Sequence, residues 1–134
     1  MIKKVQEEYP KMWGKEIWIA NNEKYCSKIL YLKQGFRCSY HYHKIKDETF
    51  YILKGTIHMI VDGEELMLYP GESIHIEPGV KHSFTGVFDS EILEVSTQHF
   101  EDDSYRENKS HKVPDQELIE LTHMACAIDL KRDN

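Results

Sequence analysis

Turn signals at short, regular intervals constrain the fold of this 134-residue chain more than any other feature. Asp62-Gly63, Pro70-Gly71 and Pro78-Gly79 punctuate a continuous stretch of alternating apolar and polar residues. Asp-Gly suits a two-residue hairpin turn because both turn positions require positive φ. The intervals between the turns hold strands of about six residues and are too short for ordinary helices. The pattern therefore predicts an all-β fold, an antiparallel sandwich or barrel.

Strand-like segments extend this pattern to both sides of the turns. Each is rich in aromatic or β-branched residues and ends near a turn-forming residue. The first ten residues are charged and predict a weakly ordered arm or an edge strand. We predict the internal strands at residues 16–20, 25–33, 56–61, 64–69, 72–76 and 91–97.

A single helix is predicted near the C-terminus. Residues 101–113 are polar and charged, and Pro114 with the acids that follow it suits a first helical turn. Leu118, Leu121 and Ala125 recur at helical spacing, which predicts an amphipathic helix that covers a barrel end or a partner subunit. We predict one domain over residues 1–134, with a barrel core at about 15–100 and a helix at about 114–128.

Composition restricts the partners of this chain. Its 23 acidic and 17 basic residues give a formal net charge of −6, which disfavours binding to nucleic acid. The sequence has no apolar run of about 18 residues, so we expect no membrane partner. Cys26, Cys38 and Cys126 form no Cys-x-x-Cys pair, which predicts reduced thiols in a cytoplasmic protein.

The segment 35–55 carries the clearest chemical pattern. His41 and His43 share one face if this segment is a strand, and a short turn can return Glu48 beside them. Imidazole and carboxylate groups suit a divalent transition metal ion, and His82, after a Pro-Gly turn, can supply a fourth ligand. The alternative is a pair of surface histidines on a tyrosine-rich strand. The glycines that frame the segment favour the metal site.

These residues resemble the paired motifs of the cupin superfamily. The first motif, Gly-x5-His-x-His-x4-Glu-x6-Gly, is matched in full by Gly35, His41, His43, Glu48 and Gly55. The second motif keeps Gly71, Gly79 and His82 but has Glu77 in place of a proline and Gly86 in place of an asparagine. The resemblance implies a cupin double-stranded β-helix, which is a jelly-roll barrel. It also implies a bound divalent transition metal: Mn, Fe, Zn, Ni or Co.

Within this superfamily, the chain looks most like the small cupin domain of type II mannose-6-phosphate isomerases. Stretches that support this are Trp13-Gly14, Gly63-Glu64-Glu65 and residues 72–76, 78–82 and 91–95. The sequence departs from that group at His41, where glutamine is common, and at Thr49-Phe50, where His-Trp is common. The resemblance implies a sugar or sugar phosphate as the small-molecule partner.

Several polar residues are candidates to contact a substrate or move a proton. Arg37 and Ser39 share strand parity with the two motif histidines, which makes them candidate substrate-binding residues. Lys46 lies in the turn between the ligands and is a third candidate, although a solvated lysine is the default there. Three residues are possible general bases that the sequence does not rank: His75, Glu77 and Glu94.

The favoured function is aldose–ketose isomerisation by metal-assisted proton transfer, because a metal can bind adjacent sugar oxygens and polarise a carbonyl. An Fe(II)-dependent dioxygenase is an alternative, since the same ligands leave positions for oxygen. A non-catalytic carbohydrate-binding or accessory cupin is a further alternative. We expect a homodimer.

Overall fold

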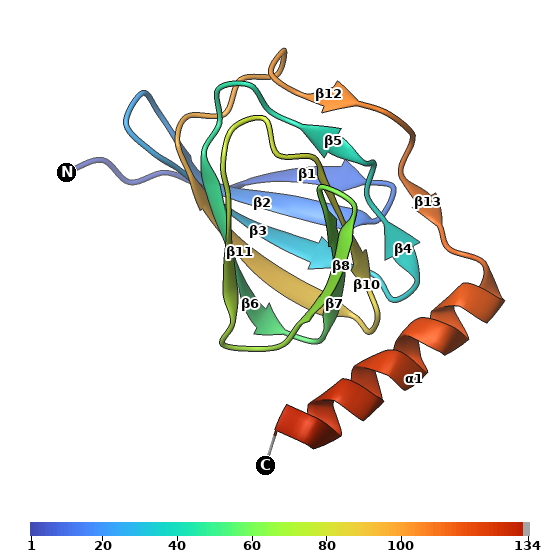
Figure 1. Cartoon of the computed structure of the whole chain (residues 1–134). Coiled ribbons are helices and arrows are strands. Elements are labelled where there is room, and N and C mark those ends of the chain that lie inside the picture. The colour runs from blue at the N-terminus through green and yellow to red at the C-terminus, as the bar shows by residue number, and fades with distance from the viewer. Residues whose placement is uncertain (133–134) are drawn as a thin grey trace.

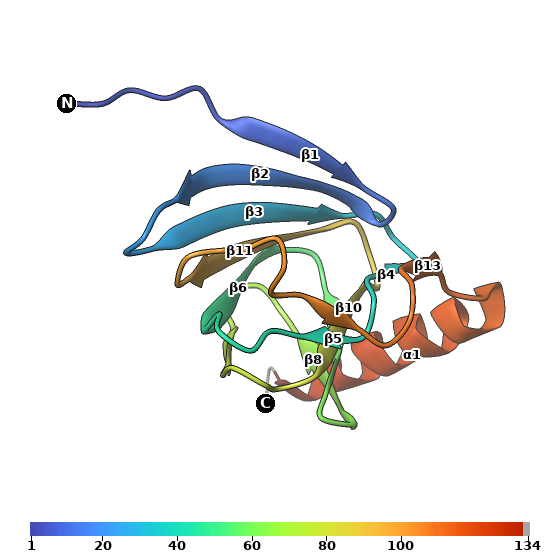
Figure 2. The ribbon, with the colours of Figure 1, turned by 90° about the horizontal axis from the view of Figure 1, so that it is seen from above.

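The computed structural model describes residues 1–132 and consists of two facing antiparallel sheets with one helix packed against them (Figure 1, Figure 2). The first sheet pairs strands that are distant in sequence, since β11 lies between β3 and β6. Its strands, in spatial order, are β1 (Glu7–Lys11), β2 (Gly14–Asn21), β3 (Cys26–Leu32), β11 (Ser90–Ser96), β6 (Glu48–Lys54) and β9 (Ser73–Ile76).

The second sheet is built from shorter strands and closes the other side of the barrel. Strand β10 is central to it and pairs with β4, β5 and β7. The strands are β12 (Tyr105–Arg106), β5 (His41–Tyr42), β10 (His82–Gly86), β4 (Phe36–Arg37), β13 (His111–Lys112), β7 (Ile57–Val61) and β8 (Glu64–Leu68). The prediction of an all-β jelly-roll barrel with one C-terminal helix is confirmed.

The hairpin predicted at Asp62-Gly63 is present. Strands β7 and β8 pair with Val61 opposite Glu64, and Asp62 and Gly63 have φ values of 46° and 82°. Two consecutive positive φ values are the signature of a type I′ turn, which matches the right-handed twist of the paired strands.

Some elements differ from the sequence prediction. Strand β1 is the edge strand that the charged N-terminal segment predicted as one alternative, but the short strands β12 and β13 were not predicted and lie outside the predicted barrel core of about 15–100. The helix α1 spans Asp115–Arg132 and so runs past the predicted end at about residue 128. Strands of two residues carry almost no hydrophobic alternation, which explains why the sequence pattern did not reveal β12 and β13.

The barrel interior changes character along the strands of the first sheet. Leu30, Ile92 and Ile52 are cross-strand neighbours, and all three are buried in the apolar core. Two residues further along β3 and β11, the inward positions are Lys28 and Glu94, which are buried and charged. One end of the barrel is therefore packed with apolar side chains, whereas the other end is polar.

The helix covers the outer face of the second sheet. Leu121 and Ala125 pack against Val87, and the Tyr69 hydroxyl donates a hydrogen bond of 2.6 Å to the Ala125 carbonyl. These contacts bury one side of the helix and leave the barrel interior open at its polar end.

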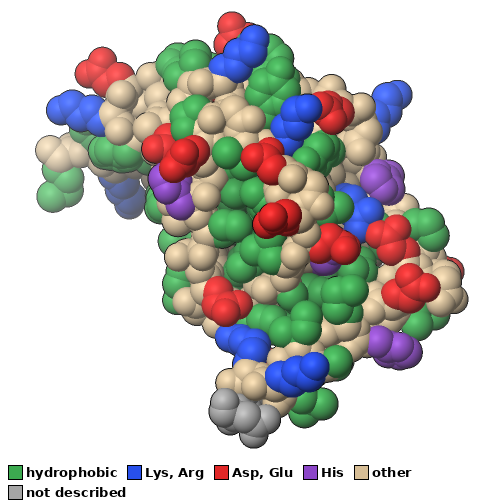
Figure 3. All heavy atoms as spheres, in the orientation of Figure 1, with side chains coloured by type: hydrophobic (Ala, Val, Ile, Leu, Met, Phe, Trp, Pro, Cys, Tyr) green, Lys and Arg blue, Asp and Glu red, His purple; other side chains and the backbone are tan. Residues whose placement is uncertain are grey.

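The surface is mixed in character. On the face drawn in Figure 3, acidic and basic side chains of residues 1–132 are interspersed with hydrophobic ones, and no large basic patch stands out. Within residues 1–132, no helix has the length and apolar character needed to cross a membrane.

Gly55, the last glycine of the first motif, should tolerate no side chain. Its φ is +84°, and an added Cβ would lie 2.2 Å from Ser90 Oγ and 2.5 Å from the Asp89 carbonyl oxygen. Gly63 has a similar φ of +82° with nothing within 4 Å of such a Cβ, so it isolates the backbone strain. We expect Gly55→Ala to lower the free energy of unfolding by about 3 kcal/mol and Gly63→Ala by about 1 kcal/mol. Denaturant unfolding measures both, and equal losses would contradict the steric explanation.

Candidate metal centre

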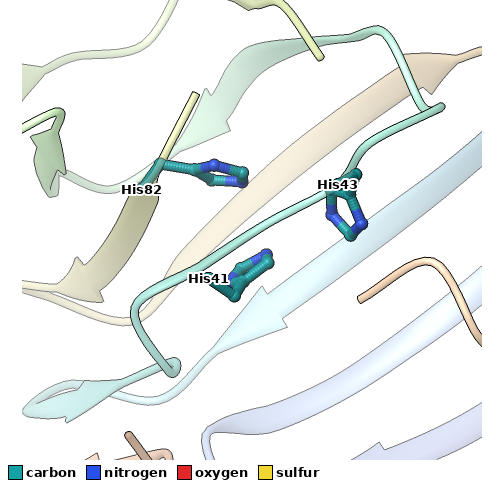
Figure 4. A group of neighbouring side chains, drawn as sticks. All are labelled: His41, His43 and His82. Atoms are coloured by element: carbon teal, nitrogen blue, oxygen red, sulfur yellow. The ribbon is translucent and has the colours of Figure 1, made fainter. Parts of the chain in front are cut away.

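Three imidazoles and one carboxylate converge at the polar end of the barrel. The ligand nitrogens of His41, His43 and His82 lie within 4.8 Å of one another, and Figure 4 shows the three rings gathered around one space. Glu48 Oε2 lies 3.5 Å from His43 Nε2 and 3.3 Å from His82 Nε2. His43, Glu48 and His82 are buried and His41 is partly buried. This group could hold a metal ion.

Backbone pairing and one buried carboxylate hold these ligands in place. In the pairing of β5 with β10, His41 lies directly opposite His82. The turn that follows His43 is held by Asp103, whose carboxylate accepts hydrogen bonds from the backbone N–H groups of residues 44–46. This turn then returns the chain to Glu48, the first residue of β6.

Hydrogen bonds to backbone carbonyls set the tautomer of each ligand histidine. Nδ1 of His41 lies 2.7 Å from the Ser39 carbonyl oxygen, and the same nitrogen of His43 and His82 lies 2.8 and 3.0 Å from a carbonyl oxygen. A carbonyl oxygen can only accept, so Nδ1 carries the proton in all three rings. Each Nε2 is therefore left with a lone pair for an ion.

The buried acceptors in this group lack partners. Glu48 Oε2 and His82 Nε2 are buried and have no hydrogen-bond partner among residues 1–132, although they lie 3.3 Å apart. Two acceptors so close together repel unless a proton or cation lies between them. Three neutral imidazole nitrogens and a carboxylate oxygen form a donor set that fits a divalent transition metal.

Burial keeps these ligands in the protonation state that metal binding needs. Desolvation, helped by the neighbouring His82, lowers the pKa of His41 to about 3, and desolvation also lowers the pKa of His43. Burial alone would raise the pKa of Glu48, but the charge of the nearby Lys46 ammonium acts against it, and this pKa is lowered to about 2. His41 and His43 are therefore neutral and Glu48 is ionised at neutral pH.

A cavity of about 140 Å³ adjoins the ligands, and its wall is mostly polar. Lys46 is 4% exposed, and its ammonium lies 3.3 Å from Glu94 Oε2, 3.7 Å from Glu48 Oε1 and 3.1 Å from His99 Nδ1. One buried cation thus lies between a metal ligand and a second carboxylate. Burial raises the pKa of Glu94, while Lys46 acts in the opposite direction.

The structure brings only some of the predicted substrate and catalytic residues to this cavity. Ser39, Lys46 and Glu94 line it. His75 and Glu77 do not, because both are exposed, and the His75 ring contacts Asp47 on the barrel surface.

Arg37 lies on the opposite side of the second sheet from the cavity. Its guanidinium donates to the hydroxyl of Thr85 at 2.7 Å and pairs with Glu117 of α1 at 2.5 Å. The parity argument fails here because the chain is not a regular strand between β4 and β5, so alternation is lost over residues 38–40. Arg37 holds the helix rather than facing the cavity.

Further cavity residues escaped the sequence reasoning. Lys28, Glu16 and Trp18 line the cavity, as does His99, whose side chain is 11% exposed. A signal for Lys28 existed, since it interrupts an alternating row of buried apolar residues on β3. No local signal marks His99, because its loop is held by hydrogen bonds to a side chain 78 residues away.

Comparison with known families decides the assignment. The family model described as Cupin domain matches residues 28–96, which include all four candidate ligands. The chain belongs to the cupin family.

Curated proteins similar to this cupin have different activities. Quercetin 2,3-dioxygenase of Bacillus subtilis is 41% identical over 51 residues, which is 38% of this chain and 15% of that protein. Mannose-1-phosphate guanylyltransferase of Salmonella montevideo is 34% identical over 98 residues, covering 70% of this chain and 21% of that protein. D-lyxose/D-mannose isomerase of Thermosediminibacter oceani is 29% identical over 112 residues, covering 63% of this chain and 62% of that protein. This cupin therefore spans less than two thirds of each relative's length.

Solved structures confirm the cupin fold. Streptomyces PAC13 with uridine superposes with a TM-score of 0.71 at 13% identity, covering 87% of this chain and 98% of that one. Oxalate decarboxylase of Bacillus subtilis, a protein with Mn(II) centres, superposes with a TM-score of 0.66 at 18% identity. The match covers 76% of this chain and 30% of that one.

Loss of His82 should weaken metal binding without unfolding the barrel. Even the outer partners of metal ligands typically contribute about 10- to 100-fold to affinity, so loss of a direct ligand should cost at least tenfold. The apolar core at the other end of this cupin remains intact in His82→Ala. Metal titration with circular dichroism as the fold check tests this, and His123→Ala on exposed helix surface is the control. Unchanged affinity in His82→Ala would reject the ligand assignment.

The metal-free protein should lose stability as the pH falls below about 6.5. The unfolded chain protonates His41 near its ordinary pKa, whereas the folded chain resists until about pH 3, so the unfolded state binds more protons between these values. Glu48 adds to the loss only below about pH 4.5, since its folded pKa is about 2. Between pH 6.5 and 5, the free energy of unfolding should therefore fall less steeply in His41→Asn, by about 1 kcal/mol per pH unit. Parallel slopes for wild type, His41→Asn and the exposed control His123→Asn would contradict this.

Proposed function

We propose that this cupin is a metal-dependent aldose–ketose isomerase that acts on a small sugar or sugar phosphate. The observation that carries the proposal is a second buried carboxylate, Glu94, in the same cavity as the ligand set. Glu94 and the ligand Glu48 both lie within 4 Å of the Lys46 ammonium. Similarity to a D-lyxose/D-mannose isomerase supports this reaction class.

The ligand set would hold a divalent transition ion such as Mn, Fe, Zn, Ni or Co. His41, His43 and His82 would provide nitrogen ligands and Glu48 an oxygen ligand. When bound, such an ion supplies a Lewis acid that polarises the sugar carbonyl. The remaining steps fall to the side chains of the chain itself.

Glu94 is suited to move the proton. Burial raises its pKa, which makes its carboxylate a stronger base than an exposed one. In an aldose, Glu94 would remove the proton from the carbon next to the carbonyl. The C–H electron pair would become the C=C bond of an enediol, and the former carbonyl oxygen would take up a proton. The proton on the neighbouring hydroxyl would then leave as that oxygen becomes the new carbonyl, and Glu94, which can exchange its proton with solvent, would protonate the former carbonyl carbon to give the ketose. Lys46, whose ammonium lies 3.3 Å from Glu94, would hold the charge on that carboxylate and donate to a substrate oxygen.

A dioxygenase is the second candidate. The relative with 41% identity over 51 residues is a quercetin 2,3-dioxygenase, and three histidines with one glutamate also suit Fe(II). Oxygen-dependent product formation would favour it over isomerisation. A carbohydrate-binding or accessory cupin would bind sugar without turnover.

The homodimer and the cytoplasmic location stay predictions. Strand β1 is at the edge of the first sheet with all five residues exposed, and Ile2 and Val5 in the arm before it are 85% and 91% exposed. An unpaired edge and exposed apolar residues favour a partner subunit. Light scattering would give the subunit count.

Turnover in heavy water should place deuterium on the carbon next to the carbonyl of the sugar, because the proposed enediol exchanges protons with solvent. Glu94→Gln should lower kcat by about 100-fold or more while keeping its metal, since a general base contributes about 10²- to 10⁴-fold. The control Glu77→Gln changes an exposed carboxylate and should keep wild-type exchange. Mass spectrometry of D-mannose and its product measures the label. Sugar binding without label would favour the binding protein, and oxygen consumption would favour the dioxygenase.

A further inference from the structure

A second group of side chains lines the cavity from the first sheet, whereas His41 and His82 come from the second sheet. Trp18 and Glu94 are the cross-strand neighbours of Lys28 on either side. The strand order β2-β3-β11-β6 thus leads from Trp18 through Lys28 and Glu94 to the strand that carries the ligand Glu48. Strands β3 and β6 are about 10 Å apart across this row, which an extended chain of several carbons can span.

Lys28 has hydrogen-bonding capacity that the protein does not use. The residue is 2% exposed, and its Nζ lies 3.8 Å from Glu16 Oε1 and 4.1 Å from the Trp18 ring centroid. Neither contact is a hydrogen bond, and none joins this ammonium to another of residues 1–132. A buried ammonium with unused donors is costly. Donors left free at a cavity wall indicate a ligand that accepts hydrogen bonds.

Glu16 supplies an acceptor beside these donors. Its Oε1 accepts a hydrogen bond of 2.9 Å from the Trp18 indole N–H. Its Oε2 forms only a distant ion pair of 4.0 Å with Lys11 and accepts no hydrogen bond from the described part of the chain. A free donor and a free acceptor side by side match a hydroxyl group, which both accepts and donates.

Each buried lysine of this wall already lies beside a carboxylate. Lys28 is paired with Glu16, and Lys46 is paired with both Glu94 and Glu48. A phosphate dianion would add negative charge beside these three carboxylates in a poorly solvated cavity, and neither buried lysine of the wall is free to offset it. This arrangement favours an uncharged ligand.

We propose that Lys28 and Glu16 form a hydroxyl-binding subsite that selects an unphosphorylated open-chain sugar or polyol. The end of the ligand away from the metal ligands binds here, and only the assignment of the reacting end rests on the proposed function. The subsite narrows the substrate class from sugars and sugar phosphates to uncharged polyhydroxy compounds.

Binding of D-mannitol, a polyol that cannot isomerise, tests this subsite. Calorimetry on metal-loaded protein should show at least tenfold weaker D-mannitol binding in Lys28→Met, which keeps the length of the side chain but removes its donors. Lys24→Met makes the same change at an exposed position and should bind like wild type. Wild type should bind D-mannitol at least tenfold more tightly than D-mannitol 1-phosphate. Metal content and melting temperature show whether each variant is folded.

Glu16→Gln provides a second test if Lys28→Met does not fold. It removes one negative charge from the wall, so the preference for D-mannitol over its phosphate should shrink at least threefold. Four results would each overturn the subsite. Two concern D-mannitol itself: wild-type affinity in Lys28→Met, or no binding to the wild-type protein. The other two concern the phosphate: tighter binding of D-mannitol 1-phosphate than of D-mannitol, or an unchanged preference between them in Glu16→Gln. Lys28-dependent D-mannitol binding without deuterium exchange would support the subsite and reject the isomerase. Deuterium exchange together with D-mannitol binding that does not depend on Lys28 would support the isomerase and reject the subsite.

Discussion

The pairing of β5 with β10 is the interaction on which the site depends, because it sets His41 opposite His82 across two adjacent strands. Strand β5 has only two residues and cannot be stable alone. It is held by pairing with β12 on its other edge and by the backbone N–H groups of the following turn, which donate hydrogen bonds to the Asp103 carboxylate. The candidate metal ligands are therefore positioned by contacts from residues 103–106, which lie well outside both motifs in the sequence.

Stability and chemistry are separated along the barrel. At one end, Leu30, Ile52 and Ile92 fill the space between the sheets. At the other end, the same strands carry buried charges that cost free energy unless they are paired. Lys46 meets this requirement through Glu48 and Glu94, so the polar end remains folded while keeping groups that can bind a ligand. The apolar end and the helix on the outer face supply the compensating burial.

The metal ligand set does not by itself distinguish among cupin activities, since relatives of this chain include both an isomerase and a dioxygenase. The other residues that line the cavity can distinguish an isomerase from a dioxygenase. Under the proposals above, Glu94 would serve proton transfer, and a wall in which each buried lysine already lies beside a carboxylate would suit an uncharged, hydroxyl-rich ligand. Three histidines held in one tautomer by backbone carbonyls provide a common platform for either chemistry.

The sequence by itself determined most of the longer strands, the Asp62-Gly63 hairpin and the four candidate ligands, because strand alternation and turn geometry are local and the cupin motifs record fixed spacings. Only the tertiary structure decided which other residues reach the cavity. The Arg37 side chain lies outside the barrel because the strand geometry is interrupted after β4. His99 lines the cavity because its loop is hydrogen-bonded to Asn21 on a distant strand. Lys28 became a cavity residue only when the sheets faced each other, since the burial of a strand face is set by the packing of its neighbours.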